Sequence, residues 1–386
     1  MIKVQEKNKY QAGNLQKHFF NKEYEYESFL PSPVNIPYQW NDKRIPVLLE
    51  EAMGLLGGLN AYSVLVPDVD FFIAMHVRNE ALKSSRIEGT ITEMDEAILP
   101  EEEISPEKRN DWIEVQNYIK ALNTSIEKLE ELPISMRLLK DAHKMLLSGV
   151  RGEHKCPGQI RKSQNWIGGT NIKTASFIPP HPDNLPEVIK DFELFLHNRH
   201  LVMPQLIQIA IAHYQFETIH PFSDGNGRIG RLLITLQLVD LRILKKPTLY
   251  LSDFFERNKG QYYDGLTFVR TQNNMDQWLI YFLSAIIETS KNGKELFEKI
   301  IALRARYEQS IMGLGRRAKL AHRLLLKLFS NPATNNARAA EMLGISINSA
   351  NRLINELAKV EILKEVTGFS RNRIFVLTDY LNLFKK

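Results

Sequence analysis

Apolar positions recur every three or four residues along most of this chain, which is typical of helices packed around a common core. Two such stretches, residues 206–219 and 229–244, are separated by a short polar loop. The same pattern predicts helices over 45–82, with a pause at Gly57-Gly58 and a restart near Pro67, and over 112–132, 134–147 and 185–197. The hydrophobic pattern therefore predicts a mainly α fold.

Two regions depart from the helical pattern. Residues 158–180 alternate aromatic and β-branched positions around Gly168-Gly169, which predicts a β-hairpin, the only strand signal in the middle of the chain. Residues 1–45 are polar and aromatic with prolines spaced through them, so we expect an extended arm that wraps the domain.

The last part of the chain, residues 316–386, forms a pattern of its own. Helices are expected over 317–329, 337–343 and 347–360, and strands over 362–366 and 373–377. This order resembles a winged helix-turn-helix, with Asn348 to Arg352 opening the recognition helix and Arg371 and Arg373 in the wing. The region holds 13 Lys and Arg against 5 Asp and Glu, but its recognition helix carries few of these cations. Contact with DNA and a protein-docking or dimerising role both remain open.

Composition sets the frame for these elements. The chain has 386 residues, of which 44% are hydrophobic and 25% charged, as expected for a globular protein of two or three domains. A single cysteine, Cys156, fits a reducing compartment. No apolar run reaches the roughly 20 residues that span a bilayer, and the first residues lack a signal-peptide core. A cytoplasmic protein without membrane contact is therefore expected.

The loop between the two central helices has the features of an anion site. Gly225 and Gly227 allow backbone N–H groups to approach a ligand, and the following helix, which begins near Arg228, offers its positive end. Arg228 and Arg231 are three residues apart, so both project from one face of the first turn. The loop is suited to phosphate groups.

Two further side chains give this loop a chemical character. Asp224 would repel phosphate unless it holds a hard cation such as Mg²⁺, which takes carboxylate and phosphate oxygens as ligands. His220, at the loop entrance, is suited to accept a proton near neutral pH. A base, a metal ligand and a phosphate cradle together indicate nucleotide phosphate transfer.

Residues His220 to Arg231 resemble the Fic family motif, His-Pro-Phe-x-Asp-Gly-Asn-Gly-Arg-x-x-Arg, at all nine of its fixed positions. The resemblance implies a Fic-fold helical core and transfer of AMP from ATP to a Ser, Thr or Tyr hydroxyl of a target protein. It implies that His220 deprotonates the hydroxyl and that Asp224 binds Mg²⁺. The nucleotide-binding residues that it implies in this segment are Gly225, Asn226, Gly227, Arg228 for the β-phosphate, Gly230, and Arg231 for the γ-phosphate.

An upstream segment, Ser84 to Gly89, resembles the family's inhibitory motif, Ser/Thr-x-x-x-Glu-Gly/Asn. Gly89 is a natural helix stop, which places Glu88 in a last turn, where the helix dipole disfavours a carboxylate and a cation would suit it better. The resemblance implies that Ser84 and Glu88 belong to an inhibitory helix. Glu88 would pair with Arg231 and keep the γ-phosphate from docking productively.

The resemblance also assigns roles to the hairpin and to a later segment. The hairpin becomes a flap that holds the target by strand addition beside the nucleotide, with Ile167, Gly168, Gly169 and Thr170 next to ATP. Alternatively, the hairpin merely covers the core. Tyr262 and Tyr263 are candidates for contact with the adenine or ribose, although adjacent aromatics on a helix usually include one core residue.

These features divide the chain into four expected parts. They are an arm and inhibitory region (1–115), a Fic catalytic domain (116–290), a helical connector (291–315) and a winged helix-turn-helix (316–386). The leading function is an autoinhibited protein adenylyltransferase that uses ATP and Mg²⁺. The alternative is a DNA-binding regulator whose Fic domain senses nucleotide or removes AMP. Because family members often pair through their Fic domains, a homodimer is also expected.

Overall fold

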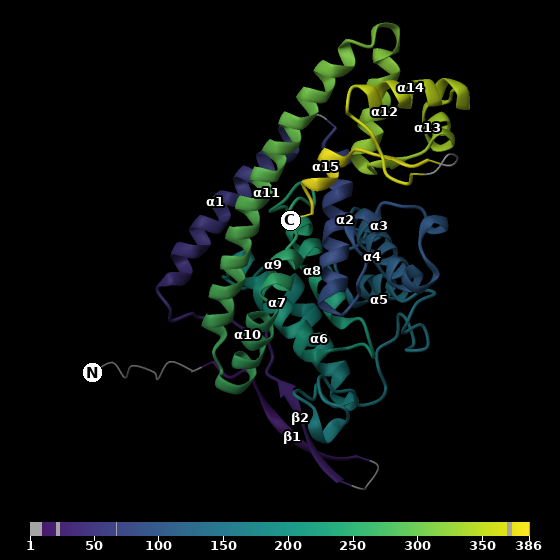
Figure 1. Ribbon diagram of the computed structural model, residues 1–386. Helices are drawn as coiled ribbons and strands as arrows, with labels where there is room; N and C mark the ends of the chain where they lie inside the picture. The colour runs from purple at the N-terminus through teal and green to yellow at the C-terminus, as the bar shows by residue number, and fades with distance from the viewer. Residues whose placement is uncertain (1–9, 21–23, 67, 369–372, 386) are drawn as a thin grey trace. The chain divides into compact units, whose positions relative to one another are not determined.

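The computed structural model describes residues 10–20, 24–66, 68–368 and 373–385 (Figure 1). It divides into two compact units. The first comprises Met1–Gly54, Lys120–Ile243 and Phe254–Glu288, and the second comprises Leu55–Ile119, Leu244–Asp253 and Thr289–Lys386. The expected boundaries at 115/116, 290/291 and 315/316 remain a proposal. The two units are described separately.

The core of the first unit is built on two consecutive helices, α7 (Gln205–Ile219) and α8 (Asn226–Asp240), as the hydrophobic pattern predicts. Fourteen of the fifteen residues of α7, from Leu206 onward, are buried, which is expected of a helix that is apolar on all sides. Helix α8 packs on α7, and α6 (Leu185–His197) and α5 (Met136–Leu146) pack on this pair. The polar loop 220–225 is thus held between two buried helices.

The N-terminal arm is more structured than expected. Strands β1 (Gly13–Phe20) and β2 (Tyr24–Pro31) pair in antiparallel fashion with Gly13 opposite Pro31. One face of the hairpin packs on the first unit, where the His18 ring stacks on His181 at a centroid distance of 4.5 Å. The other face leaves Leu15 and Phe19 61% and 72% exposed. These exposed apolar residues hide the strand alternation in the sequence, so the arm was wrongly expected to be merely extended.

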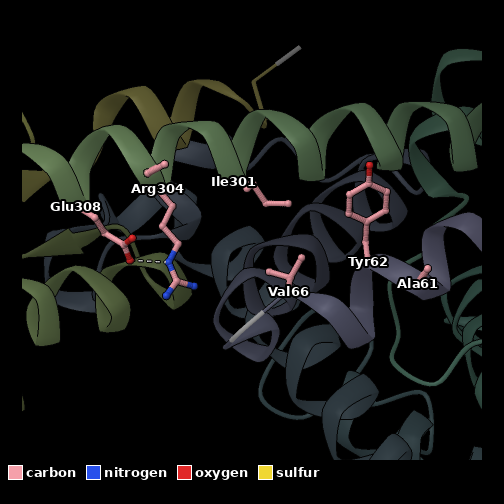
Figure 2. Close-up of a pocket in the computed structure, with 7 residues that line it drawn as sticks. Ala61, Tyr62, Val66, Ile301, Arg304 and Glu308 are labelled. Atoms are coloured by element: carbon pink, nitrogen blue, oxygen red, sulfur yellow. Dashed lines mark hydrogen bonds and ion pairs between the residues drawn. The ribbon is translucent and has the colours of Figure 1, made fainter.

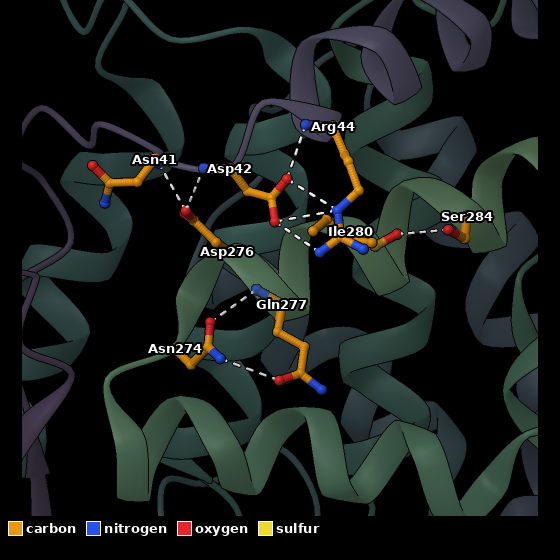
Figure 3. A network of polar contacts seen from close by, with 8 residues as sticks. All are labelled: Asn41, Asp42, Arg44, Asn274, Asp276, Gln277, Ile280 and Ser284. Atoms are coloured by element: carbon orange, nitrogen blue, oxygen red, sulfur yellow. Dashed lines mark hydrogen bonds and ion pairs between the residues drawn. The ribbon is translucent and has the colours of Figure 1, made fainter.

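A carboxylate at the start of α11 (Met275–Met312) holds the segment that follows the hairpin (Figure 3). Asp276 accepts hydrogen bonds from the Tyr38 hydroxyl at 2.6 Å and from the backbone N–H groups of Asn41 and Asp42 at 2.7 and 2.9 Å. Asp42 forms an ion pair with Arg44 at 2.7 Å. A carboxylate in a first helical turn is also favoured by the helix dipole.

Long helices in the chain run through two boundaries that the sequence predicts. Helix α1 (Arg44–Leu65) continues without a break through Gly57-Gly58, and α11 continues past residue 290 into the expected connector. The pause at Gly57-Gly58 was therefore a wrong expectation. Two glycines weaken a helix by only about 1 kcal/mol each, and the burial of Ala52, Leu56 and Leu59 offsets this cost.

In the second unit, a buried carboxylate ties α2 (Val69–Ile87) to neighbouring elements. Glu80 accepts hydrogen bonds from the Tyr118 hydroxyl at 3.0 Å and from both the N–H and the hydroxyl of Ser252, at 3.1 and 2.5 Å. Tyr118 lies on α4 (Arg109–Lys128) and Ser252 opens α9 (Ser252–Arg257). The other helices outside the C-terminal region are α3 (Met94–Ala97) in this unit and α10 (Lys259–Gln272) in the first unit.

The C-terminal region follows the predicted order of elements. Its helices are α12 (Ala318–Ser330), α13 (Asn336–Leu343), α14 (Ile347–Lys359) and α15 (Thr378–Asn382), and its strands β3 (Ala333–Thr334), β5 (Phe375–Val376) and β4 (Lys364–Glu365) form a sheet in that order. Gly344 ends α13 with φ 67°, and the Ser346 hydroxyl caps α14. Glu356 of α14 forms an ion pair with Arg317. Arg371 lies outside the described residues.

A groove of about 450 Å³ in the second unit runs along α1 and α11 (Figure 2). It is lined by Ala61, Tyr62, Val66, Ile301, Arg304, Ala305 and Glu308, and Arg304 donates to Glu308 at 2.8 Å. None of the motif residues lines it. Within the described part of the chain, no helix is both long enough and apolar enough to span a bilayer.

Candidate active site

The site is built where α7 ends. His220 caps this helix in the left-handed backbone region, with φ 50° and ψ 60°, and its N–H donates to the Phe216 carbonyl at 2.9 Å. Left-handed backbone is uncommon for any residue other than glycine, although histidine, asparagine and aspartate adopt it more often than the rest. It costs of the order of 1–3 kcal/mol, and such residues cluster at functional sites.

The ring of His220 is partly exposed and makes a contact that bears on its tautomer. Its Nδ1 lies 3.4 Å from the Glu217 carbonyl oxygen. Because a carbonyl oxygen can only accept, this contact favours a proton on Nδ1 and a lone pair on Nε2. In this tautomer Nε2 is the atom able to take a proton.

The loop that follows is held by a buried amide. Asn226 is 2% exposed, and its side chain accepts from the Phe222 N–H at 2.8 Å and donates to the Phe222 carbonyl at 2.8 Å. Gly225 precedes the first turn of α8 with φ 75° and donates its N–H to the Asp224 carboxylate at 2.5 Å. The side chain of Asn226 therefore shapes the loop, while a phosphate contact through its backbone remains a prediction.

The two motif arginines are both buried in the first turns of α8. Arg228 and Arg231 are 4% and 3% exposed, and a guanidinium nitrogen of Arg228 lies 3.7 Å from a carboxylate oxygen of Asp224. Burial lowers the pKa of the His213 imidazole to about 3, and the positive charge of Arg231 contributes to this shift. The loop and the first turns of α8 thus carry the His220 imidazole, the Asp224 carboxylate and both guanidinium groups.

The sequence missed one member of the site, His143 of α5. Its ring lies parallel to the ring of Phe222, with centroids 3.9 Å apart and an interplanar angle of 7°. Its Nδ1 accepts from the Gly158 N–H at 2.8 Å, so its Nε2 carries the proton and donates to the Asp224 carbonyl at 2.9 Å. Burial lowers the pKa of His143 to about 4. No local pattern distinguishes this histidine from an ordinary core residue.

Asp224 fits the expected role of a magnesium ligand. Its side chain is 40% exposed, although its backbone carbonyl is held by His143. Among the described residues, no group of three or more His, Cys, Asp and Glu side chains could hold a metal ion. Mg²⁺ in nucleotide enzymes is commonly held by one or two carboxylates together with substrate phosphates and water, and a single aspartate next to two buried arginines suits that mode.

Comparison with known protein families explains this loop. A Fic/DOC family model matches residues 133–238, and a Fic/DOC N-terminal model matches residues 47–127. The chain therefore contains a Fic/DOC N-terminal domain and a Fic/DOC family domain. The first match spans α5 to α8 and contains the whole loop, and the second contains α2.

The curated relatives match only part of this chain. Proteins named protein adenylyltransferase Fic from Drosophila erecta and Aedes aegypti are each 29% identical to this chain over 136 residues. The match covers 35% of this chain and 25% of either relative. The chain thus spans about a quarter of the length of these relatives.

Solved structures support the same fold. A Fic family protein from Desulfovibrio desulfuricans G20 has a TM-score of 0.53 at 19% identity, over 88% of this chain and 98% of that one. A Fic domain containing signaling protein from Bacteroides thetaiotaomicron VPI-5482 has a TM-score of 0.54 at 16% identity, over 65% of this chain and 97% of that one. At these identities the likeness concerns the Fic fold alone.

The expected flap of the Fic domain is a shorter pairing than a regular hairpin. Ile167 and Phe177 form an isolated antiparallel bridge, with Ile167 N–H donating to Phe177 at 2.8 Å. Between them Gly168 and Gly169 have φ near 70°, and a 3₁₀ turn capped by Asn171 fills the loop. Because residues 172–174 form this 3₁₀ turn, they do not extend the pairing of the bridge into a regular hairpin. Gly168, Gly169 and Thr170 are exposed, and their contact with ATP remains a prediction.

Of the two adjacent tyrosines on α10, one is buried and the other is exposed, as is usual for neighbouring aromatic residues on a helix. Tyr262 is 1% exposed, and its hydroxyl lies 2.8 Å from Nε2 of His213. Tyr263 is 40% exposed. Of the two candidates for contact with the nucleoside, Tyr263 is therefore the accessible one.

The segment Ser84 to Gly89, which resembles the inhibitory motif, ends α2 as its sequence predicts. Ser84 is fully buried, Glu88 is the C-cap residue, and Gly89 follows with φ 98°. Glu88 is exposed and lies at the C-terminal end of α2. The helix dipole disfavours a carboxylate at this end, so a nearby cation would stabilise it. Ser84 and Glu88 belong to the second unit and Arg231 to the first, so their pairing remains a proposal.

Proposed function

We propose that this protein transfers AMP from ATP to a Ser, Thr or Tyr hydroxyl of a target protein and releases pyrophosphate. The observation that carries the proposal is the left-handed turn at His220, which places an imidazole at the entrance of the loop that also carries Asp224 and leads into Arg228 and Arg231. The adenylyltransferase names of relatives that share the Fic domain support it.

The chemistry assigns each group one task. Nε2 of His220 takes the proton of the target hydroxyl while the hydroxyl oxygen forms a bond to the α-phosphorus of ATP. The bond between the α-phosphorus and the oxygen that bridges the α- and β-phosphates breaks, and pyrophosphate leaves. Arg228 and Arg231 offset the negative charge that passes to the leaving pyrophosphate. Asp224 would hold Mg²⁺, which neutralises charge on the phosphate oxygens.

We further propose that Glu88 inhibits this reaction by pairing with Arg231. A guanidinium paired with a carboxylate is no longer available to the γ-phosphate, so ATP would bind in a pose unsuited to attack. The C-cap position of Glu88 after a buried Ser84 supports this role. Removing the carboxylate should then raise the rate of transfer without new contacts to substrate.

The deciding experiment uses Glu88→Gly with ATP labelled at the α- or the γ-phosphate, and a lysate or the protein itself as target. Label retained on protein from α-labelled ATP alone, at several times the rate of the unmodified chain, is the expected result. Label from the γ-position alone would indicate phosphate transfer instead. Equal rates with and without Glu88 would remove the inhibitory role.

A second candidate function is supported by the basic C-terminal region, residues 316–386. Its net charge of +8 and the order α12, α13, α14, β4, β5 are compatible with a winged helix-turn-helix that contacts DNA or a protein. A DNA-binding regulator whose Fic domain senses nucleotide or removes AMP would bind DNA with strong salt dependence and would show no label transfer. Gel-shift titrations of the full chain at two salt concentrations separate the two functions.

A further inference from the structure

A buried arginine outside the motif lies against the turn that carries His220. Arg161 is 4% exposed, and its side chain donates from Nε to the His220 carbonyl at 2.9 Å and from Nη2 to the Ile219 carbonyl at 3.5 Å. Its own backbone N–H donates to the Pro221 carbonyl at 3.0 Å. One residue thus contacts three successive carbonyls where α7 ends and the catalytic loop begins.

The same guanidinium also holds both ends of the flap. Nη1 donates to the Ser163 carbonyl at 3.3 Å, and Nη2 donates to the Pro180 carbonyl at 2.5 Å. Ser163 precedes the Ile167–Phe177 bridge and Pro180 follows it, so Arg161 contacts the chain on both sides of the flap. The fork of the guanidinium therefore joins the flap base to the His220 turn.

These bonds have a physical reason to be arranged this way. The last carbonyls of a helix have no partner within the helix, and a cation at that end also suits the helix dipole. The left-handed conformation of His220 is costly and persists only where surrounding contacts determine it. Each acceptor of the Arg161 side chain is a backbone carbonyl, so its bonds fix main-chain positions.

We propose that Arg161 is a positioning residue for the transfer reaction, holding the His220 turn and the flap in one fixed relation. The inference rests on the proposed function, since it concerns the alignment of a base on the turn with a target segment on the flap. Arg161 acts through the backbone of both segments. Its planar fork matters more than its charge, because a lysine ammonium cannot reach separated carbonyls in several directions at once.

The test compares Arg161→Met and Arg161→Lys in the Glu88→Gly background. The matched control is Arg78→Met, which removes a guanidinium that donates to the Ser330 carbonyl in the second unit. We expect Arg161→Met to lower kcat by about 100-fold and to raise the KM for the target. The Kd for ATP should change by less than about threefold. Arg161→Lys should recover less than about a tenth of the lost rate, and Arg78→Met should keep the parental kcat.

A second readout does not depend on activity. Amide hydrogen exchange of Arg161→Met should show faster exchange at Ile167, Ser176 and Phe177 together with the 219–222 turn, while α7 and α8 keep their protection. His220→Ala should leave this exchange pattern intact. If the parental chain transfers no AMP, the proposed function fails and the exchange pattern still decides the role of Arg161. Unchanged protection in Arg161→Met, or full recovery of rate with lysine, would overturn the inference.

Discussion

The imidazole of His143 lies flat on the ring of Phe222 and donates a hydrogen bond to the carbonyl of Asp224. The motif loop is thereby held from outside as well as by its own Asn226. The carboxylate expected to bind Mg²⁺ belongs to the residue whose carbonyl is fixed in this way. A histidine 81 residues away in the sequence thus helps to hold the motif loop in its shape.

Replacing His143 by Phe keeps a ring on Phe222 and removes the bonds to Asp224 and Gly158. We expect transfer to slow by about 10- to 100-fold, because a small displacement of catalytic groups is costly. The unfolding free energy should fall by about 1–3 kcal/mol, because a buried carbonyl and N–H lose their partners. Measurement of kcat and of urea unfolding checks both.

The matched control for this variant is His197→Phe, since Nε2 of His197 lies 2.6 Å from the Ile134 carbonyl in the same unit but outside the loop. It should lose stability without losing rate. Equal kcat values for the two variants would contradict a special role for His143.

Buried histidines predict acid sensitivity of the fold. Burial lowers the pKa of His76 and of His143 to about 4, and of His213 to about 3, against an ordinary value near 6.5. Between these values the unfolded chain binds more protons, so stability is complete above pH 6.5 and is lost as the pH falls. The expected loss from pH 6.5 to 5 is about 2 kcal/mol for each histidine.

Urea unfolding at several pH values measures this slope, and His143→Phe should reduce it by about a third. A stability that stays constant from pH 7 to 5 would contradict neutral burial of these rings.

Gly230 illustrates how closely the two central helices pack. A Cβ there would lie 2.2 Å from a carboxylate oxygen of Glu217 and 3.2 Å from the Phe216 ring. We expect Gly230→Ala to destabilise the protein by about 1–3 kcal/mol, since overpacking forces neighbouring groups to shift.

Gly57→Ala is the control, because it lies within α1 with no atom within 4 Å of the added Cβ. That substitution should stabilise the fold by up to about 1 kcal/mol. Thermal unfolding of both variants should shift the midpoint in opposite directions, and a shift in the same direction would argue against the close packing at Gly230.

Replacing His220 by Ala should abolish transfer while leaving ATP affinity nearly unchanged, because the base acts in the chemical step. Isothermal titration with ATP and a label-transfer assay in the Glu88→Gly background measure the two effects. A large loss of ATP affinity would instead assign His220 a binding role.

The sequence by itself determined the order of the central helices, the loop between them and the residues at its entrance and exit. These follow from local rules: apolar spacing defines α7 and α8, glycines permit the turn, and the twelve-residue motif is contiguous. The end of α2 at Glu88-Gly89 was predicted correctly for the same reason.

Only the tertiary structure decided which distant residues hold that loop. His143 and Asp224 are 81 residues apart, and Arg161 and His220 are 59 apart, so no spacing rule connects them. The N-terminal hairpin and the short flap likewise depend on partners across the first unit, such as the bond from Phe29 N–H to the Ile178 carbonyl. Packing of the helices brings these groups together, and no local sequence pattern encodes that arrangement.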